Sequence, residues 1–328
     1  MNGKEEFDWS KATHDQWYIA CRSKQLNTKH PLARTILDQP IVLFRGEDGR
    51  AGALRDRCAH RNLALSRGKV DAHGLRCAYH GWTWNADGHC THIPASCGTC
   101  ETYANLCVPT YRVMEKQGFI WVALGEPNRD PFDFPNFTGE GWHHWVMERE
   151  FESHAFHCVE NFLDVPHTAH VHRGLFRGDE SKEIEIEITS GVDWIQAEFL
   201  NEERMESIIG RLLVPKDGRI VHTDRFQLPY VTRVDYRMSE RRQYIVMSQC
   251  TPETAEQTRV FTYMAYRFDP LGIAVRAVFE PLSHWILNQD VRILREQTED
   301  LRRTGPAKFL YWETDAIARG IRDLLDGK

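Results

Sequence analysis

The chain carries the sequence CAH at residues 58–60 and, after sixteen intervening residues, CAYH at residues 77–80. Each segment contributes one cysteine and one histidine, whereas a common zinc finger places both cysteines on one arm and both histidines on the other. The interleaved order suits a two-iron cluster in which one iron takes two thiolates and the other takes two imidazoles, as in Rieske ligation. The predicted cluster ligands are Cys58, His60, Cys77 and His80. A single zinc ion held by the same four side chains is the alternative.

Short strand-like runs surround these two segments. They lie at residues 35–37, 41–44, 51–54, 75–77 and 82–84, with a hairpin at 111–114 and 119–122. Many short strands separated by turn residues predict a small antiparallel sandwich or barrel. The segment EPNRDP at residues 126–131 is rich in proline and polar residues, which marks a domain boundary. We therefore predict a first domain at residues 1–130, with its core at about 15–125.

The rest of the chain has a different pattern. Residues 183–189 alternate between acidic and apolar side chains, as a half-buried strand does. Further strand-like runs lie at 226–234, 243–249 and 259–268. Apolar residues recur at helical spacing from 271 to 303, and a short terminal amphipathic helix is predicted at 314–325. The predicted fold class is α+β, with an all-β N-terminal domain followed at residues 131–328 by an antiparallel sheet covered by helices.

Composition excludes several classes of protein. Of the 328 residues, 41% are hydrophobic and 27% are charged, which is ordinary for a globular chain. No run approaches the roughly 18 apolar residues of a bilayer span, and a net charge of −6 is unlike that of a general nucleic-acid binder. We therefore expect no membrane and no nucleic acid as partners. The N-terminus is polar and acidic and shows no apolar segment of an export signal. Nine cysteines in such a chain predict reduced thiols or metal ligands, and we expect a cytoplasmic protein.

With these motifs the sequence resembles the terminal oxygenase components of Rieske non-haem iron oxygenases. The resemblance runs from Trp17-Tyr18-Ile19-Ala20 to the C-terminal helices. It implies a Rieske [2Fe-2S] cluster in the first domain and a mononuclear Fe(II) in the second. It also implies that the second domain is a helix-grip-like catalytic domain.

The resemblance assigns the mononuclear iron to a second motif, D-x-x-H-x-x-x-x-H, at residues 164–172. The two imidazoles that match the family motif are His167 and His172, and the matching carboxylate is Asp290 in the long predicted helix. Two imidazoles and one carboxylate on one face of Fe(II) leave open positions for oxygen and substrate.

The assignment of the carboxylate has an alternative. Asp290 could be a surface residue paired with Arg292 or Arg295, and Asp300 or Glu296 would then take its place as ligand. A carboxylate that faces a domain interior needs partners that offset its desolvation, and a metal ion supplies one.

Two further residues are implied to act in catalysis. In the family, the aspartate that matches Asp164 lies at a subunit interface. The resemblance therefore implies that Asp164 links His80 of one chain to His167 of the neighbouring chain by charge-assisted hydrogen bonds. A head-to-tail ring of three subunits would bring the unlike metals together, so a homotrimer is expected. Asp164 could instead cap a helix or orient His167. Asn161 is expected to line the open side of the iron.

The predicted function is that of the terminal oxygenase component of a multicomponent Rieske monooxygenase. It would use O2 to hydroxylate, or to O- or N-dealkylate, a small, largely apolar organic substrate that is aromatic or cyclic. Electrons would come from a separate NAD(P)H-dependent flavin reductase, directly or through a ferredoxin, because the chain has no G-x-G-x-x-G dinucleotide motif. The alternatives are a cis-dihydroxylating aromatic-ring dioxygenase, a Rieske electron carrier or redox sensor without oxygen chemistry, and a zinc hydrolase.

Four cysteines downstream of the cluster segments fall outside the family pattern. They are spaced C-x6-C-x2-C-x6-C and comprise Cys90, Cys97, Cys100 and Cys107. Four thiolates could hold a structural zinc, but such a site needs the loop to fold back on itself. Free cysteines near the sheet are the simpler interpretation.

Overall fold

The computed structural model describes residues 14–94, 105–172, 185–200, 220–269, 272–305 and 308–327. The chain divides into an N-terminal unit, Thr13–Asp133, and a C-terminal unit that is mostly Phe134–Lys328. Among the described residues, no helix is both long enough and apolar enough to cross a membrane.

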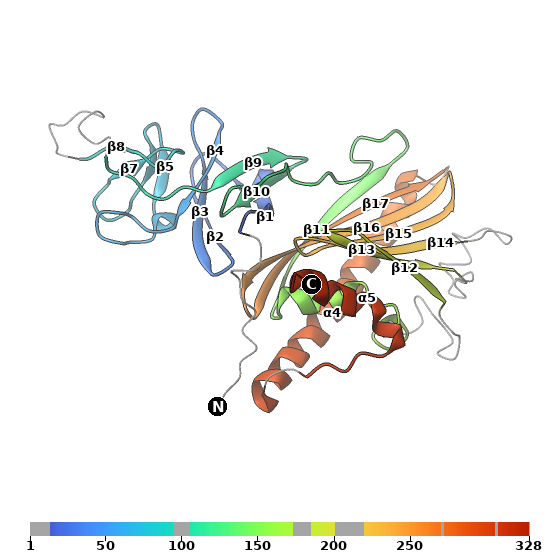
Figure 1. Cartoon of the computed structure of the whole chain (residues 1–328). Helices are drawn as coiled ribbons and strands as arrows, with labels where there is room; N and C mark the ends of the chain where they lie inside the picture. Colours follow the sequence, from blue (N-terminus) through green and yellow to red (C-terminus); the bar gives the residue numbers. More distant parts are fainter. Residues whose placement is uncertain are drawn as a thin grey trace. The chain divides into compact units, whose positions relative to one another are not determined.

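The N-terminal unit consists of three small antiparallel sheets with strand orders β1-β10-β9, β2-β3-β4 and β5-β6-β7-β8 (Figure 1). The strands are β1 (Tyr18–Arg22), β2 (Leu32–Ile36), β3 (Gln39–Arg45), β4 (Ala51–Arg55), β5 (Lys69–Asp71), β6 (Gly74–Arg76), β7 (Thr83–Trp84), β8 (Cys90–His92), β9 (Arg112–Lys116) and β10 (Phe119–Ala123), with short 3-10 turns η1 (Ser23–Gln25) and η2 (Leu65–Arg67). The centres of β3 and β10 are buried on both faces, which explains their unbroken runs of apolar residues.

The C-terminal unit is built on one seven-stranded antiparallel sheet with strand order β11-β17-β16-β15-β14-β13-β12. Its elements are β11 (His143–Phe151), α1 (Ala155–Phe162), α2 (His167–His170), β12 (Ile186–Ser190), β13 (Trp194–Phe199), β14 (Val221–Gln227), β15 (Val231–Ser239), β16 (Arg242–Thr254), β17 (Gln257–Phe268), α4 (Gly272–Thr304), η3 (Glu313–Asp315) and α5 (Ala316–Leu325). In Figure 1 the helices α4 and α5 cover one face of this sheet. The predicted α+β fold class is confirmed.

Helix α4 packs on the sheet through a buried stripe that recurs every three or four residues. Leu287, Asp290, Leu294 and Thr298 are buried along it, and Phe279 contacts Tyr244 of β16. Residues three and four apart share one face of a helix. Asp290 therefore projects toward the interior of the unit, although every neighbour on its stripe is apolar or uncharged.

One predicted strand is wrong. Residues 226–234 do not form a single strand, because β14 ends at Gln227 and β15 begins at Val231. Pro229 has no N–H to donate to a sheet, and Tyr230 has a positive φ of 53°, so the chain turns here instead. The apolar residues on both sides of this turn gave the appearance of one continuous strand in the sequence. Strands β11 and β13 were not predicted either, and their residues mix polar and apolar types.

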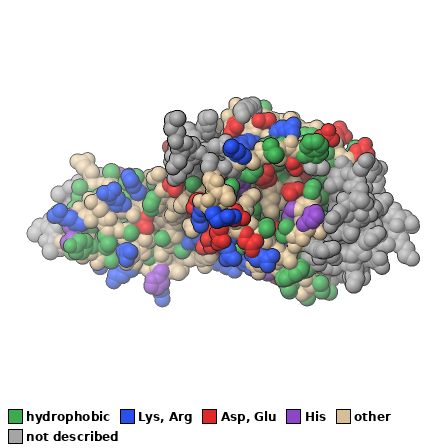
Figure 2. Space-filling view, turned by 90° about the horizontal axis from the view of Figure 1, so that it is seen from below, with side chains coloured by type: hydrophobic (Ala, Val, Ile, Leu, Met, Phe, Trp, Pro, Cys, Tyr) green, Lys and Arg blue, Asp and Glu red, His purple; other side chains and the backbone are tan. Residues whose placement is uncertain are grey.

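One face of the molecule carries charges of both signs (Figure 2). On the face shown in Figure 2, basic and acidic side chains are interspersed and no single sign of charge prevails. This agrees with a sequence in which 41 basic residues stand against 47 acidic ones.

Candidate metal centres

The first cluster of metal-binding residues lies at the tips of two loops of the N-terminal unit. Cys58 and His60 follow β4, and Cys77 and His80 lie between β6 and β7. Both cysteines are buried, neither is in a disulfide, and both belong to a hydrophobic core with Trp84. The ring centroids of the two histidines are 4.5 Å apart. The structure thus brings all four predicted cluster residues together, and they line one small hollow.

The two loops close by the same pair of backbone hydrogen bonds. In the first loop the carbonyl of Cys58 accepts from the N–H of Asn62, and the N–H of Cys58 donates to the carbonyl of Leu63. In the second loop the carbonyl of Cys77 accepts from the N–H of Gly81, and the N–H of Cys77 donates to the carbonyl of Trp82. Asn62 and Gly81 both have positive φ, 61° and 72°, a conformation that asparagine and glycine adopt most readily. The equivalence of these turns fixes the two thiols side by side.

The donor set fits a two-iron cluster. Nδ1 of His60 is buried and has no hydrogen-bond partner in the described part of the chain, while its ring stacks on Trp82 at 4.4 Å. Buried polar atoms in proteins are normally paired, so an unpaired ring nitrogen beside two buried thiols is suited to a metal. Burial lowers the pKa of His60, and the neighbouring His80 adds to this effect. Burial raises the pKa of Cys58, with Cys77 adding to the effect.

Gly81 offers a stability test of the second cluster loop. A Cβ at this position would lie 2.8 Å from Cγ of Pro94, in a backbone conformation with φ of +72°. We expect Gly81→Ala to destabilise the protein by about 1–3 kcal/mol through backbone strain and the contact, and to lower its iron–sulfur content. The measurement is thermal unfolding together with visible absorption of the purified protein.

Gly118→Ala is the matched control for this prediction. Gly118 has a similar φ of +78°, but a Cβ there meets nothing within 4 Å. This variant should therefore show only the backbone strain of about 1 kcal/mol and keep its cluster. Equal losses of stability and of cluster in the two variants would contradict the role given to the Pro94 contact.

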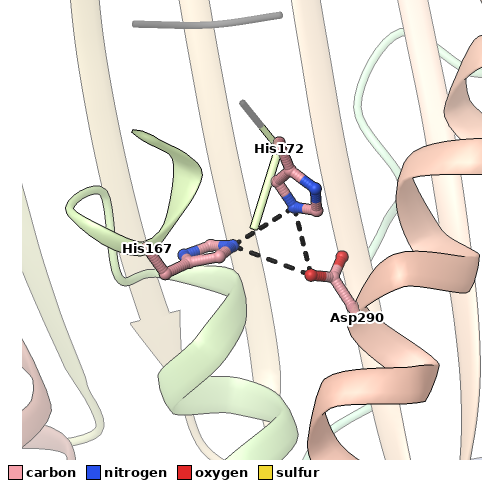
Figure 3. A group of neighbouring side chains, drawn as sticks. All are labelled: His167, His172 and Asp290. Atoms are coloured by element: carbon pink, nitrogen blue, oxygen red, sulfur yellow. Dashed lines mark hydrogen bonds and ion pairs between the residues drawn. The ribbon is translucent and has the colours of Figure 1, made fainter. Parts of the chain in front are cut away.

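The second cluster of metal-binding residues lies in the C-terminal unit. It consists of His167 on α2, His172 just after α2, and Asp290 on α4 (Figure 3). Nε2 of His172 is 3.1 Å from Oδ1 of Asp290, Nε2 of His167 is 3.7 Å from the same oxygen, and the two Nε2 atoms are 3.3 Å apart. Figure 3 shows the three side chains pointing toward one another from separate elements.

The other ring nitrogens of both histidines are engaged, which orients the Nε2 atoms toward Asp290. Nδ1 of His167 hydrogen-bonds the backbone carbonyl of Asp164, and Nδ1 of His172 lies 2.7 Å from Oε1 of Gln289. Ligand histidines in metal sites characteristically hold an acceptor at the ring nitrogen that does not face the metal. Sequence reasoning missed Gln289, because an amide next to a carboxylate on a helix is too common to be a signal.

Helix α4 is anchored close to this group. The guanidinium of Arg149 on β11 donates to Oδ1 of Asn288 at 3.1 Å and lies 2.8 Å from Nδ1 of His284. Asn288 is only two residues from Asp290, so this contact holds the relevant turn of α4 against the sheet.

Asp290 is the residue that most clearly requires a partner. Its side chain is 7% exposed and its Oδ1 is buried without a hydrogen bond in the described residues. Burial raises the pKa of this carboxyl group, but contacts with His167 and His172 outweigh burial and the net pKa is lowered. Burial likewise opposes protonation of His167, yet Asp290 reverses this and raises its pKa. Two imidazoles and an ionised carboxylate form a donor set that fits Fe(II).

The remaining candidates lie around this group. Asp164 is partly exposed, and its Oδ2 is 3.9 Å from Nδ1 of His167. Burial raises the pKa of Asp164; the nearby His167 opposes this effect, and Asp315 and Glu160 add to it. Asn161 on α1 is one of the groups that lower the pKa of Asp290.

The alternative carboxylates on α4 face away from this group. Glu296 pairs with Arg292 and Asp300 pairs with Arg303, both on the exposed side of the helix. Of the four cysteines considered for a structural zinc, Cys97 and Cys100 lie outside the described residues. Cys90 is buried and Cys107 is exposed, and neither forms a disulfide in the described part of the chain.

Both units of the chain match models of known protein families. A family model of the Rieske [2Fe-2S] domain matches residues 16–112, and a model of the vanillate O-demethylase oxygenase C-terminal domain matches residues 151–327. The chain belongs to the Rieske non-haem iron oxygenases, with a catalytic domain of the vanillate O-demethylase type. It therefore has a [2Fe-2S] domain and a domain with a mononuclear iron site.

Three curated relatives illustrate the similarity. The chain is 38% identical over 160 residues to a putative toluene-4-sulfonate monooxygenase iron-sulfur subunit of Comamonas testosteroni, covering 48% of this chain and 45% of that protein. It is 35% identical over 191 residues to the oxygenase component of dicamba O-demethylase of Stenotrophomonas maltophilia, covering 55% and 54%. The chain spans about half the length of these two relatives. It is 25% identical over 343 residues to the vanillate O-demethylase oxygenase subunit of a Pseudomonas species, covering 94% and 93%.

Solved structures agree on the fold. Dicamba monooxygenase bound to 3,6-dichlorosalicylic acid superposes with a TM-score of 0.83 at 23% identity, covering 95% of this chain and 97% of that one. NdmA of Pseudomonas putida CBB5 with caffeine gives a TM-score of 0.79 at 20% identity, covering 98% and 92%. At these identities the likeness shows the architecture of the chain and nothing about its substrate.

Proposed function

We propose that this chain is the terminal oxygenase component of a multicomponent Rieske monooxygenase. The observation that carries the proposal is the buried Oδ1 of Asp290, which accepts no hydrogen bond within the described residues and lies 3.1 Å and 3.7 Å from the Nε2 atoms of two oriented histidines. In this proposal His167, His172 and Asp290 hold Fe(II), while Cys58, His60, Cys77 and His80 hold the cluster. When bound, the iron would supply dioxygen activation with electrons delivered by the cluster.

Residues beside the iron site would orient its ligands and connect the two metal centres. Asn161 would line the open side of the site, and Gln289 would keep the proton of His172 on Nδ1 so that Nε2 remains a lone-pair donor. Asp164 would connect the two metals across a subunit boundary. Its partly exposed carboxylate beside His167 and the exposed position of His80 support this role. A homotrimer follows as part of the proposal, because a closed head-to-tail ring satisfies every such contact.

The proposed chemistry is hydroxylation, or O- or N-demethylation, of a small and largely apolar aromatic or cyclic compound. Support comes from relatives that are described as demethylases of dicamba and vanillate and as a toluene-4-sulfonate monooxygenase. Cis-dihydroxylation is the alternative within the same class. The proposed electron donor is a flavin reductase, with or without a ferredoxin. Exposed basic residues flank the Cys58 loop and suit an acidic donor: Arg57, Arg61, Arg67 and Lys69.

We also propose the division into a Rieske domain at residues 1–130 and a catalytic domain at 131–328, and a cytoplasmic location. None of the seven described cysteines forms a disulfide, which suits a reducing compartment.

The proposed function can be tested by coupled turnover. The protein, purified anaerobically and supplied with ferrous iron, would be mixed with a ferredoxin, a flavin reductase and NADH, and given a panel of methoxybenzoates and methylxanthines. We expect oxygen uptake with one equivalent of formaldehyde released per substrate demethylated. A reducible cluster with no substrate-dependent oxygen uptake, even from the dithionite-reduced protein, would favour the electron-carrier alternative.

The role of Gln289 gives a separate prediction. Gln289→Leu removes the acceptor 2.7 Å from Nδ1 of His172, and we expect iron affinity to fall about 10- to 100-fold, the usual effect of losing such a partner. Gln289→Glu keeps an acceptor and should retain the iron. Ferrous affinity is measured by competition with a chromogenic chelator. Equal affinities in all three proteins would show that Gln289 does not orient His172.

A further inference from the structure

A polar cavity of about 150 Å³ lies beside the iron site, between α1, α4 and the start of α5. His157, Glu160 and Asn161 of α1 line it, together with Gln297 of α4. It also borders Asp164 and Asp315 but includes none of the three residues assigned to the iron. The cavity is therefore a neighbour of the metal group.

Three buried polar atoms at this cavity have no hydrogen-bond partner in the described residues. They are Nδ1 of His157, Nδ2 of Asn161 and Oε1 of Gln297, contributed by two different helices. Buried polar groups without protein partners are normally satisfied by ordered water, and a polar cavity holds about one water per 30 Å³. This cavity has room for several water molecules. Water in this cavity would lie next to the side chains that carry these three atoms.

The cavity wall runs from solvent to the iron site. The Glu160 side chain is 22% exposed, and its Oε2 is 3.8 Å from Nδ1 of His157, too far for a direct hydrogen bond but suitable for a bridging water. His157 is only 5% exposed. At the other side of the cavity lies Asp164, whose Oδ2 is 3.9 Å from Nδ1 of His167. The cavity therefore has the partly exposed Glu160 on one side and a neighbour of the iron site on the other.

We propose that this cavity is the proton entry of the oxygenase, with His157 and Glu160 as proton carriers and Asn161 and Gln297 as residues that position the water. The proposal rests on the proposed function. Hydroxylation consumes O2, two electrons and two protons and converts R–H to R–OH with release of one water. The electrons arrive from the reductase through the cluster, so the two protons must reach a buried site by another carrier. A polar cavity that borders Asp164, the neighbour of His167, meets this need when it is filled with water.

Other charged and titratable groups surround His157. His154 is the N-cap residue of α1, with its ring centroid 6.0 Å away, and burial lowers the pKa of His154 to about 3, so that it stays neutral. The ring of Phe309 contacts His157, and the guanidinium of Arg322 on α5 lies 5.9 Å from the centroid of the same Phe309 ring. Among these groups, Glu160 is the one that pairs with Nδ1 of His157 and reaches solvent.

The first test uses the resting protein and no turnover. A crystal structure at high resolution should show ordered waters that bridge the three unpaired atoms. Gln297→Leu should lose the waters bound to its amide and keep the fold. A cavity without ordered water in the wild-type crystal would overturn the proposal.

The second test is single turnover of the reduced, iron-loaded protein with O2 and substrate in H2O and D2O. We expect His157→Gln to keep its iron and its cluster absorption but to form product about 10²-fold more slowly, the lower end of what a positioned proton donor contributes, with a larger solvent isotope effect. Glu160→Gln should show a smaller loss of the same kind. His89→Gln is the matched control, an exposed histidine of the N-terminal unit, and should behave as wild type.

The outcomes separate the two proposals. If the wild-type protein forms no product with any substrate, the proposed function fails and the proton entry fails with it. If the wild type turns over and His157→Gln matches it in both rate and isotope effect, the proton entry fails while the proposed function stands.

Discussion

Asp164→Asn should lower turnover by about 10- to 100-fold while the protein keeps its cluster and its mononuclear iron. The proposed link between metals of neighbouring subunits uses charge-assisted hydrogen bonds, each worth about 1.5–3 kcal/mol, and the substitution removes the charge. Iron should be retained, because Nδ1 of His167 bonds the backbone carbonyl of Asp164, which every substitution preserves, whereas the carboxylate lies 3.9 Å away. Asp164→Ala removes the hydrogen-bonding group as well and should lose more activity.

The measurement is stopped-flow oxidation of the dithionite-reduced cluster by O2 in the presence of substrate, with total iron and cluster absorption determined on the same samples. Slow cluster oxidation with full metal content supports the bridging role. Activity near that of the wild type would refute it. Loss of mononuclear iron from both variants would instead identify Asp164 as a residue that positions His167.

His172→Ala should abolish turnover and reduce the iron content from about three to about two atoms per chain, the two of the cluster. The side chain contributes one of the three converging donor atoms, and its removal also leaves the Gln289 amide without its partner. The cluster should be unaffected, because all four of its proposed ligands lie in the N-terminal unit. The visible spectrum should therefore stay that of the wild type.

The matched control is His170→Ala, which removes an exposed histidine from α2 itself. This variant should keep three irons and near-normal activity. Bleaching of the visible absorption in His172→Ala would contradict the division of ligands between the two centres. Retention of the third iron would remove His172 from the ligand set.

Several features could be predicted from sequence because they are local. The strands next to the cluster segments, the α+β class and the long C-terminal helix follow from apolar spacing over short windows. The prediction failed at residues 226–234, where an apolar run continues through the turn at Pro229. Spacing does not reveal which apolar residues lie in a strand and which lie in a turn that is itself buried.

The sequence by itself determined the two kinds of metal chemistry, because the order of cysteine and histidine in two short segments, and the spacing of His167 and His172, limit what those side chains can bind. Only the tertiary structure decided which carboxylate of α4 meets the histidines, since Asp290, Glu296 and Asp300 occupy one helix and differ only in the face they present. It also decided the pairing of His172 with Gln289, 117 residues away, and the shared cavity of α1 and α4. Contacts between distant segments depend on how the helices pack on the sheet, and no local pattern encodes that packing.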